Sequence, residues 1–225
     1  MAPTGDARGY WLDASDGGVF AFGDAVFHGS LPALGFHPAG SGLPHSLNAP
    51  VVGMVRSAKG HGYFLVASDG GVFAFGDATF AGSCPGIGGC AGAAVSVVPD
   101  HSGDGYWLVT RSGNVYAFGN ASYPGAPGKV GAPVTSAVRA PDGRGFWMLL
   151  ANGTVHAYGD AVHYGDTTGH FGGLNPATAI FSTSDGGGYW VVSADGTVDS
   201  YGDAPFEISV AERHLKALII AGTGF

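Results

Sequence analysis

Short apolar runs rich in aromatic and β-branched residues alternate along the chain with turns that contain glycine. The stretch GYWLDASDGGVFAFGDAVFHGS, residues 9–30, has two such runs on either side of Asp16-Gly17. Residues 62–83, GYFLVASDGGVFAFGDATFAGS, nearly repeat it. These residue types favour strands, and an Asp-Gly pair supplies the positive φ angles of a tight hairpin turn. The pattern therefore predicts β-hairpins.

The same phrase occurs five times, which predicts a repeat architecture. The repeat cores are residues 9–30, 62–83, 105–126, 145–166 and 188–209. A Gly-Asp-Ala or Gly-Asn-Ala landmark recurs at spacings of 53, 43, 40 and 43 residues, at Asp24, Asp77, Asn120, Asp160 and Asp203. A further apolar stretch precedes each core after the first. The pattern therefore predicts four strands in each repeat unit. Strands that are apolar on both faces are typical of sheets that are covered on two sides.

The two ends of the chain complement each other. The first core has no apolar stretch before it, whereas the last is followed by LKALIIAG, residues 215–222, which matches LNAPVVG at residues 47–53. Five sheets packed around an axis bury both faces of each, and closure of the ring removes exposed edges. We expect an all-β protein with one domain over residues 1–225. We expect this domain to be a five-bladed β-propeller of four-stranded blades, whose first blade is completed by the strand at 215–222. A linear solenoid is disfavoured because neither end has a polar cap.

Composition restricts the classes of partner. Charged residues make up 12% of the 225 residues, the net charge is −8, and the 9 Lys and Arg are scattered. The sequence thus has no basic patch for nucleic acid or an anionic membrane surface. No apolar run approaches the roughly 20 residues of a membrane span. We expect a monomer with neither a nucleic-acid partner nor a membrane span.

Cys84 and Cys90 lie close together in GSCPGIGGCAG. A local disulfide that closes a small loop is one interpretation, and it favours an oxidising compartment. Two free thiols in a reducing cytosol are the other. A structural zinc site is disfavoured because it needs four ligands.

The repeated phrase, of the type GYWLVASDGGVFAFGDA, resembles a repeat of secreted, cell-envelope-associated proteins of actinobacteria. There it often accompanies peptidoglycan amidase, peptidase or esterase domains. The resemblance covers essentially the whole chain and implies a secreted or cell-envelope location and an accessory role. The expected architecture is also similar to five-bladed lectins of the tachylectin type, which implies one sugar site per blade.

Residues kept in every copy are candidates for a repeated ligand site. Tryptophan offers an apolar face to a pyranose and an N–H to a hydroxyl, and the candidates of this type are Trp11, Trp107, Trp147 and Trp190. The landmark residues offer oxygen acceptors, at Asp24, Asp77, Asn120, Asp160 and Asp203. Each set has a structural alternative. The tryptophans can pack between blades, and the landmark side chains can accept hydrogen bonds from their own backbone two residues on.

Departures from the repeat are candidates for single sites. Asp13 stands where the other copies have Val66, Val109, Leu149 and Val192. Its carboxylate is therefore either exposed near the ring closure or part of a site. His156, His163 and His170, together with Asp166, offer zinc ligands, but their spacing matches no zinc motif, and we expect no metal.

No catalytic constellation stands out in the sequence. The only glutamates are Glu207 and Glu212, and most aspartates lie in repeated turns. No G-x-S-x-G elbow is present. We expect no catalytic residue and no cofactor, and a glycosidase that uses the central channel is kept as an alternative.

Two links between repeats are expected on the same rim, because each joins the outermost strand of one blade to the innermost strand of the next. They are residues 31–48 and the Cys84–Cys90 loop. Long loops on a rigid scaffold often carry recognition, so these links favour a protein partner. Our leading expectation is a secreted, non-catalytic module that binds carbohydrate, such as a cell-envelope or extracellular polysaccharide, at sites repeated around the ring.

Overall fold

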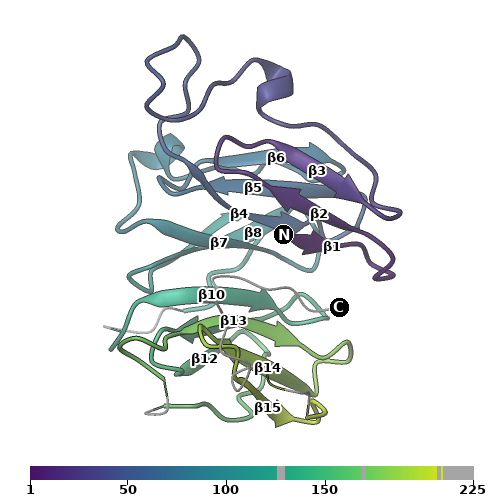
Figure 1. Ribbon diagram of the computed structural model, residues 1–225, viewed down its shortest axis with the longest axis vertical. Helices are drawn as coiled ribbons and strands as arrows, with labels where there is room; N and C mark the ends of the chain where they lie inside the picture. The colour runs from purple at the N-terminus through teal and green to yellow at the C-terminus, as the bar shows by residue number, and fades with distance from the viewer. Residues whose placement is uncertain (126–129, 169–170, 207–208, 210–225) are drawn as a thin grey trace. The chain divides into compact units, whose positions relative to one another are not determined.

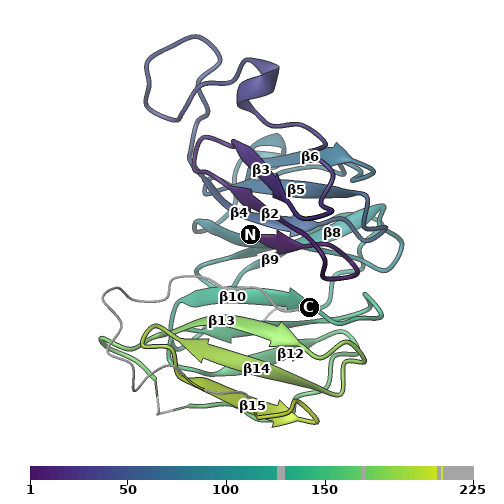
Figure 2. The ribbon, with the colours of Figure 1, turned by 45° about the vertical axis from the view of Figure 1, so that its right-hand side comes forward.

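The computed structural model describes residues 1–125, 130–168, 171–206 and 209. Within these residues the chain is all-β and forms five antiparallel sheets of three strands, one for each repeat core (Figures 1 and 2). The chain divides into two compact units, residues 1–123 and 124–225. The expected closing strand at 215–222 lies outside the described residues.

The first unit contains three of the sheets, coloured purple to teal in Figure 1. In each sheet the second strand along the chain lies in the middle and pairs with the other two. The strands are β1 (Ala2–Pro3), β2 (Tyr10–Asp13), β3 (Val19–Phe22), β4 (Val51–Arg56), β5 (Gly62–Ala67), β6 (Val72–Gly76), β7 (Ala94–Pro99), β8 (Gly105–Thr110) and β9 (Val115–Gly119).

The second unit contains two sheets of the same design, coloured green to yellow. Their strands are β10 (Val134–Arg139), β11 (Phe146–Leu150), β12 (Val155–Tyr158), β13 (Ala177–Ser182), β14 (Gly188–Ser193) and β15 (Val198–Gly202). The four sheets with a full-length first strand share one irregularity, a register shift near the start of that strand. The repeat in the sequence thus becomes a repeat in backbone geometry.

Sheets that follow one another within a unit pack face to face, as their apolar two-sided strands predict. In β5 every residue is buried. Tyr63 belongs to the core shared with Trp11 of the first sheet, whereas Phe64 belongs to the core shared with Tyr106 of the third sheet. Consecutive side chains of this strand therefore fill two different cores. In the second unit, the core between the sheets is built in the same way around Trp147.

The predicted hairpin turns are confirmed. The glycine after Asp16, Asp69, Ser112, Asn152 and Asp195 has a φ angle between 80° and 90° in all five copies. In the first copy, the Asp16 carboxylate accepts a hydrogen bond of 2.8 Å from the Gly18 backbone N–H. Because the side chain and the glycine both fix this turn, the register between the second and third strands is the same in every sheet.

The predicted fourth strand is not formed in the described residues. The segment after each third strand, such as residues 24–30 after β3, has no ladder partner. The expectation that the first core lacks a leading strand also needs correction. Residues 2–3 form β1, with Ala2 opposite Trp11 and Pro3 opposite Tyr10. This occupies only part of the length that β4 has in the second sheet.

Candidate functional site

The segment that follows each third strand, which we call the latch segment, is held by side chains instead of by a strand ladder. The first bond is made by tryptophan. Trp11 Nε1–H donates to the carbonyl oxygen of Val26, 2.8 Å away. The same bond recurs, at 2.7–2.8 Å, from Trp107 to Ser122, from Trp147 to Val162 and from Trp190 to Pro205.

The tryptophan side chains are therefore occupied inside the fold. Trp11, Trp107 and Trp147 are buried, and Trp190 is half-buried. The burial of Trp11, Trp107 and Trp147 agrees with the packing alternative. Their indole N–H groups are already donated to the backbone, so a sugar hydroxyl would have to compete with that bond.

The second bond comes from a tyrosine of the next sheet in the same unit. Tyr63 Oη donates to the carbonyl oxygen of Gly29, 2.6 Å away, and accepts from the His28 backbone N–H at 3.2 Å. Tyr106 and Tyr189 make the same pair of bonds to their preceding latch segments. Burial raises the pKa of these three hydroxyls above the ordinary value of 10.0, so they stay protonated and able to donate.

One residue of the latch segment is exposed in every copy. In the first and fourth copies it lies between the carbonyl bonded by tryptophan and the amide bonded by tyrosine. The other three copies have one of these two bonds. The residue is aromatic or histidine, is exposed in all five copies, and is Phe27, Phe80, Tyr123, His163 and Phe206. The four aromatic ones are 51% to 78% exposed. We call these residues the repeated exposed rings.

The repeated exposed rings were missed as binding candidates in the sequence. The signal was present, because a ring recurs three residues after every landmark Asp or Asn. The expected fourth strand left the exposure of these rings undecided, because alternation along a strand does not say which face is exposed. The rings are exposed because the latch segment is irregular and is held at its backbone.

The landmark carboxylates connect two loops, and do not bond their own turn as expected. Ser57 Oγ donates to Asp77 Oδ1 at 2.5 Å, and the His61 backbone N–H donates to Asp77 Oδ2 at 3.1 Å. Thr4 makes the corresponding bond to Asp24 at 3.2 Å, and Thr183 to Asp203 at 3.3 Å. These carboxylates therefore tie the turn before the second strand to the end of the third.

The other two copies have no hydroxyl at the position that Thr4, Ser57 and Thr183 occupy. In the third copy that position is Asp100, whose buried carboxylate accepts from the backbone of its own turn, and the landmark is the uncharged Asn120. In the fourth copy the position is Ala140, and Asp160 has no hydrogen-bond partner among the described residues. An aspartate opposite Asp100 would face a like charge, which the asparagine avoids.

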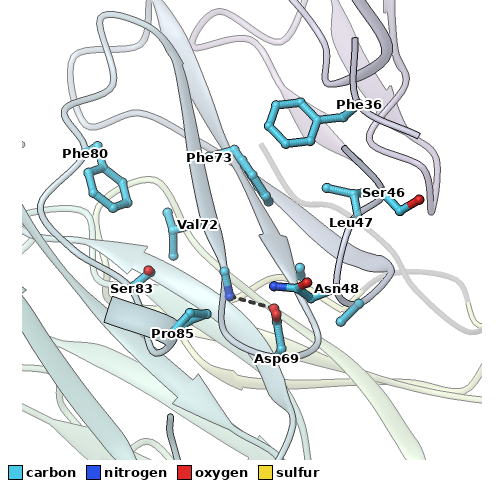
Figure 3. A pocket seen from close by; sticks show the side chains of 13 residues that line it. Phe36, Ser46, Leu47, Asn48, Asp69, Val72, Phe73, Phe80, Ser83 and Pro85 are labelled. Atoms are coloured by element: carbon cyan, nitrogen blue, oxygen red, sulfur yellow. Dashed lines mark hydrogen bonds between the residues drawn. The ribbon is translucent and has the colours of Figure 1, made fainter. Parts of the chain in front are cut away.

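A depression of about 250 Å³ lies beside Phe80 in the first unit (Figure 3). Phe36 and Phe73 contribute two rings with centroids 6.0 Å apart and planes at 68°. Asn48 and Asp69 add an amide and a carboxylate at the opposite end of the view. Rings combined with a few polar groups are the usual lining of a site for a small polar ligand.

The two links expected on one rim do lie together. Phe36 and Asn48 of the first link line the same depression as Pro85 of the second. Each link contains a short 3₁₀ helix, η1 (Pro32–Leu34) and η2 (Pro85–Ile87). The first link extends away from the sheets of its unit in both views (Figures 1 and 2).

Cys84 and Cys90 form the expected disulfide across η2, with Cα atoms 5.2 Å apart. Cys84 is fully buried and lies over Gly70, where an added Cβ would be 2.4 Å from its Sγ. In the first link Leu31 takes the corresponding place over Gly17. The glycine of the hairpin turn is thus covered by a leucine in the first repeat and by a disulfide-bonded cysteine in the second.

The single sites weighed in the sequence have simple surroundings. The Asp13 carboxylate accepts from the amino group of Met1 at 2.9 Å. His163 Nε2 lies 3.6 Å from Asp166 Oδ2. Burial, with the nearby His163, lowers the pKa of His156 below its ordinary value of 6.5. His170 lies outside the described residues, and within them no three His, Cys, Asp or Glu side chains gather as metal ligands would.

Comparison with models of known protein families and with curated proteins finds no match to this chain. Within the described ranges, no helix is long and apolar enough to cross a membrane.

Proposed function

We propose that this chain is a non-catalytic carbohydrate-binding module, secreted or associated with the cell envelope. The observation that carries the proposal is the exposed ring after every sheet, on backbone held by buried side chains. An aromatic ring in a fixed position stacks on the apolar face of a pyranose and loses little conformational freedom on binding. A residue kept at one position in every copy is what a repeated binder requires.

Single sites of this kind bind weakly, so the expected ligand is a polymer. One ring covers one sugar face, and neighbouring sites gain from avidity when a single chain reaches several of them. A cell-envelope or extracellular polysaccharide has the required repeats. The Cys84–Cys90 disulfide supports an oxidising, extracellular location.

The proposed scaffold is a closed five-bladed propeller over residues 1–225, in which each sheet is one blade. The support is the tyrosine bond between a sheet and the latch segment before it, which Tyr63, Tyr106 and Tyr189 make. Tyr10 holds the corresponding position in the first sheet, and its side chain is 39% exposed. If the ring closes, Tyr10 meets the latch segment after β15. Tyr10→Phe then lowers the free energy of unfolding as much as Tyr63→Phe does, whereas no loss contradicts closure.

Binding to a glycan array that includes peptidoglycan and other wall polysaccharides tests the proposed function. The variant Phe27→Ala/Phe80→Ala/Tyr123→Ala removes three repeated exposed rings of the first unit. The matched control is Leu34→Ala/Leu43→Ala/Ile87→Ala, which removes three exposed apolar side chains from the links. We expect the ring variant to lose binding and the control to retain it. Calorimetry with a soluble oligosaccharide should give several equivalent sites per chain.

A protein-interaction scaffold is the second candidate function. The observation in its favour is the exposure of Leu34 (64%), Leu43 (52%) and Ile87 (57%) on the two links. A folded chain that binds no glycan, and that captures one protein only while these three side chains are intact, would replace the carbohydrate proposal. The glycosidase alternative has no observation in its favour, and Glu207 and Glu212 lie outside the described residues.

A further inference from the structure

A second depression in the first unit has a different chemistry from the one beside Phe80. Its volume is about 430 Å³, and it lies where β4 turns into β5 and where β3 ends. This is the opposite end of the second sheet from the links, because it adjoins the turn before β5, not the hairpin after it. The basic residues in its wall are His28, Arg56, Lys59 and His61.

Hydrogen-bond donors are in excess in this depression. Arg56 forms no ion pair or side-chain hydrogen bond within the described part of the chain, and a guanidinium carries five N–H donors and no acceptor. Lys59 Nζ is 4.0 Å from Asp104 Oδ1, and both side chains are more than half exposed. Arg56 and Lys59 are 2 of the 9 Lys and Arg in a chain of net charge −8.

The two carboxylates in the same wall already have partners. Asp6 accepts from Thr4 Oγ1 at 2.9 Å and from the Arg8 backbone N–H at 3.2 Å, and Arg8 Nε lies 3.7 Å from its second oxygen. Asp24 lies 3.2 Å from the same Thr4 hydroxyl. Neither carboxylate forms an ion pair or a hydrogen bond with Arg56 among the described residues.

Two of the basic groups, His28 and Arg56, lie against neighbouring residues. The His28 ring lies 6.4 Å from the Trp11 ring and 5.8 Å from the Tyr63 ring. The Arg56 guanidinium lies against Gly5, where an added Cβ would be 2.4 Å from its Nη1. Glycine at position 5 therefore leaves the space that the guanidinium occupies. Groups placed in advance in this way lose less freedom when a ligand binds.

We propose that this depression binds the oxyanion group of an acidic ligand, a carboxylate or a phosphate. The Arg56 guanidinium pairs with two oxygens of that group at once, because its planar fork matches their spacing. Lys59 supplies a second charge, and the imidazoles of His28 and His61 form the adjoining wall. The volume accommodates a ligand of monosaccharide size. The site does not depend on the repeated exposed rings and is a further binding function of this chain.

Titration of the full chain with inorganic phosphate and, separately, with glucuronate tests the proposal, with two-dimensional NMR as the readout. We expect saturable shifts at residues 28, 56 and 61 with at least one of the two probes. A stronger response to phosphate indicates a phosphate-bearing ligand, and a stronger response to glucuronate indicates an acidic sugar. The absence of saturable shifts with both probes would overturn the proposal.

Variants show whether the shifts arise from the proposed contact. Arg56→Gln should weaken binding by about tenfold or more, because a charge-assisted pair is lost. Arg56→Lys keeps the charge but loses the fork, so an intermediate loss is expected. Gly5→Ala should weaken binding by displacing the guanidinium. Arg111→Gln, outside the depression, is the matched control and should bind as the unmodified chain does.

Two checks distinguish loss of the proposed contact from unfolding of the variant and from binding at the repeated exposed rings. The denaturation midpoint of Arg56→Gln shows whether the variant is folded, and Gly5→Ala repeats the test with Arg56 itself intact. Phe80→Ala should leave phosphate and glucuronate binding unchanged, so the oxyanion site and the repeated exposed rings can fail independently. Equal affinity of Arg56→Gln and the unmodified chain would refute the role assigned to Arg56.

Discussion

The hydroxyl of Tyr63 donates to the carbonyl oxygen of Gly29 across 2.6 Å, joining the second sheet to the segment that follows the first. The same hydroxyl accepts from the His28 N–H. One side chain thus satisfies a backbone donor and a backbone acceptor that lack a strand partner. The same contact recurs at Tyr106 and Tyr189, whereas the fourth sheet has Phe146, which carries no hydroxyl, at this position.

Removal of the Tyr63 hydroxyl should therefore destabilise the fold. In Tyr63→Phe, the Gly29 carbonyl and the His28 N–H both lose their partner, and we expect the free energy of unfolding to fall by about 1–2 kcal/mol. Urea denaturation followed by tryptophan fluorescence measures the change. Tyr123→Phe, which removes an exposed hydroxyl, should change it by less than about 0.5 kcal/mol. Equal effects of the two substitutions would contradict the assigned role of Tyr63.

Trp107 and Phe80 should behave in opposite ways. Trp107 is buried with its N–H bonded to Ser122, so Trp107→Ala should cost about 3–5 kcal/mol of stability. Phe80→Ala should leave stability within about 0.5 kcal/mol, because the ring is exposed, and should weaken glycan binding. Denaturation and a polysaccharide pull-down on both variants distinguish core from site. A stable Trp107→Ala chain with weakened binding would reverse the assignment.

The landmark carboxylates should differ in importance from copy to copy. Asp77→Asn leaves one acceptor oxygen for the two donors Ser57 Oγ and His61 N–H, so stability should fall by about 1–2 kcal/mol. Asp160→Asn is the matched control, because Asp160 has no hydrogen-bond partner among the described residues, and its effect should stay within about 0.5 kcal/mol. The two denaturation curves must differ if the carboxylate connects the loops. Coincident curves would show that it does not.

The disulfide should stabilise the first unit through its short loop. Cys84 and Cys90 are 6 residues apart, and closing a loop of that size contributes about 2 kcal/mol through the entropy of the unfolded chain. Denaturation with and without dithiothreitol should show this difference, and Cys90→Ala should be insensitive to the reductant. An unchanged midpoint on reduction of the natural chain would contradict the prediction.

His156 should make stability fall in mild acid. Its pKa in the folded protein is lowered by burial and by His163 from the ordinary 6.5. The unfolded chain therefore takes up the proton first, and stability is lost as the pH falls below about 6.5 toward the folded-state pKa. His156→Phe, which introduces the residue found at positions 20 and 73, should reduce the difference between denaturation midpoints at pH 7.5 and pH 5.5. If the full difference persists, another group is responsible.

Much of the local structure could be predicted from the sequence. Asp-Gly, Ser-Gly and Asn-Gly pairs between aromatic, β-branched runs gave the five hairpins in their correct places. The fourth strand could not be predicted correctly, because the residues that replace its ladder are distant in the chain. Trp11 is 15 residues from Val26, and Tyr63 is 34 residues from Gly29. A pattern of local preferences does not contain such bonds.

The candidate site depended still more on packing. Tryptophan is the better sugar-stacking residue by chemistry, yet Trp11 is buried, while Phe27 in the same copy is exposed. The basic depression was also absent from the sequence reasoning, because His28 belongs to the first repeat and Arg56 to the second. Adjacent sheets bring these residues together, and their separation along the chain gives no sign of it.

By itself, the sequence determined three strands of each repeat, the hairpin turns and the repeat itself, and it favoured a disulfide between Cys84 and Cys90. Each of these follows from the conformational preference of a few neighbouring residues, or from two cysteines too close in the chain to miss one another. The tertiary structure decided which rings are buried, which are exposed and which charges share a depression. Those properties depend on the neighbouring sheets, because the same alternating strand has a different exposed face according to what packs against it.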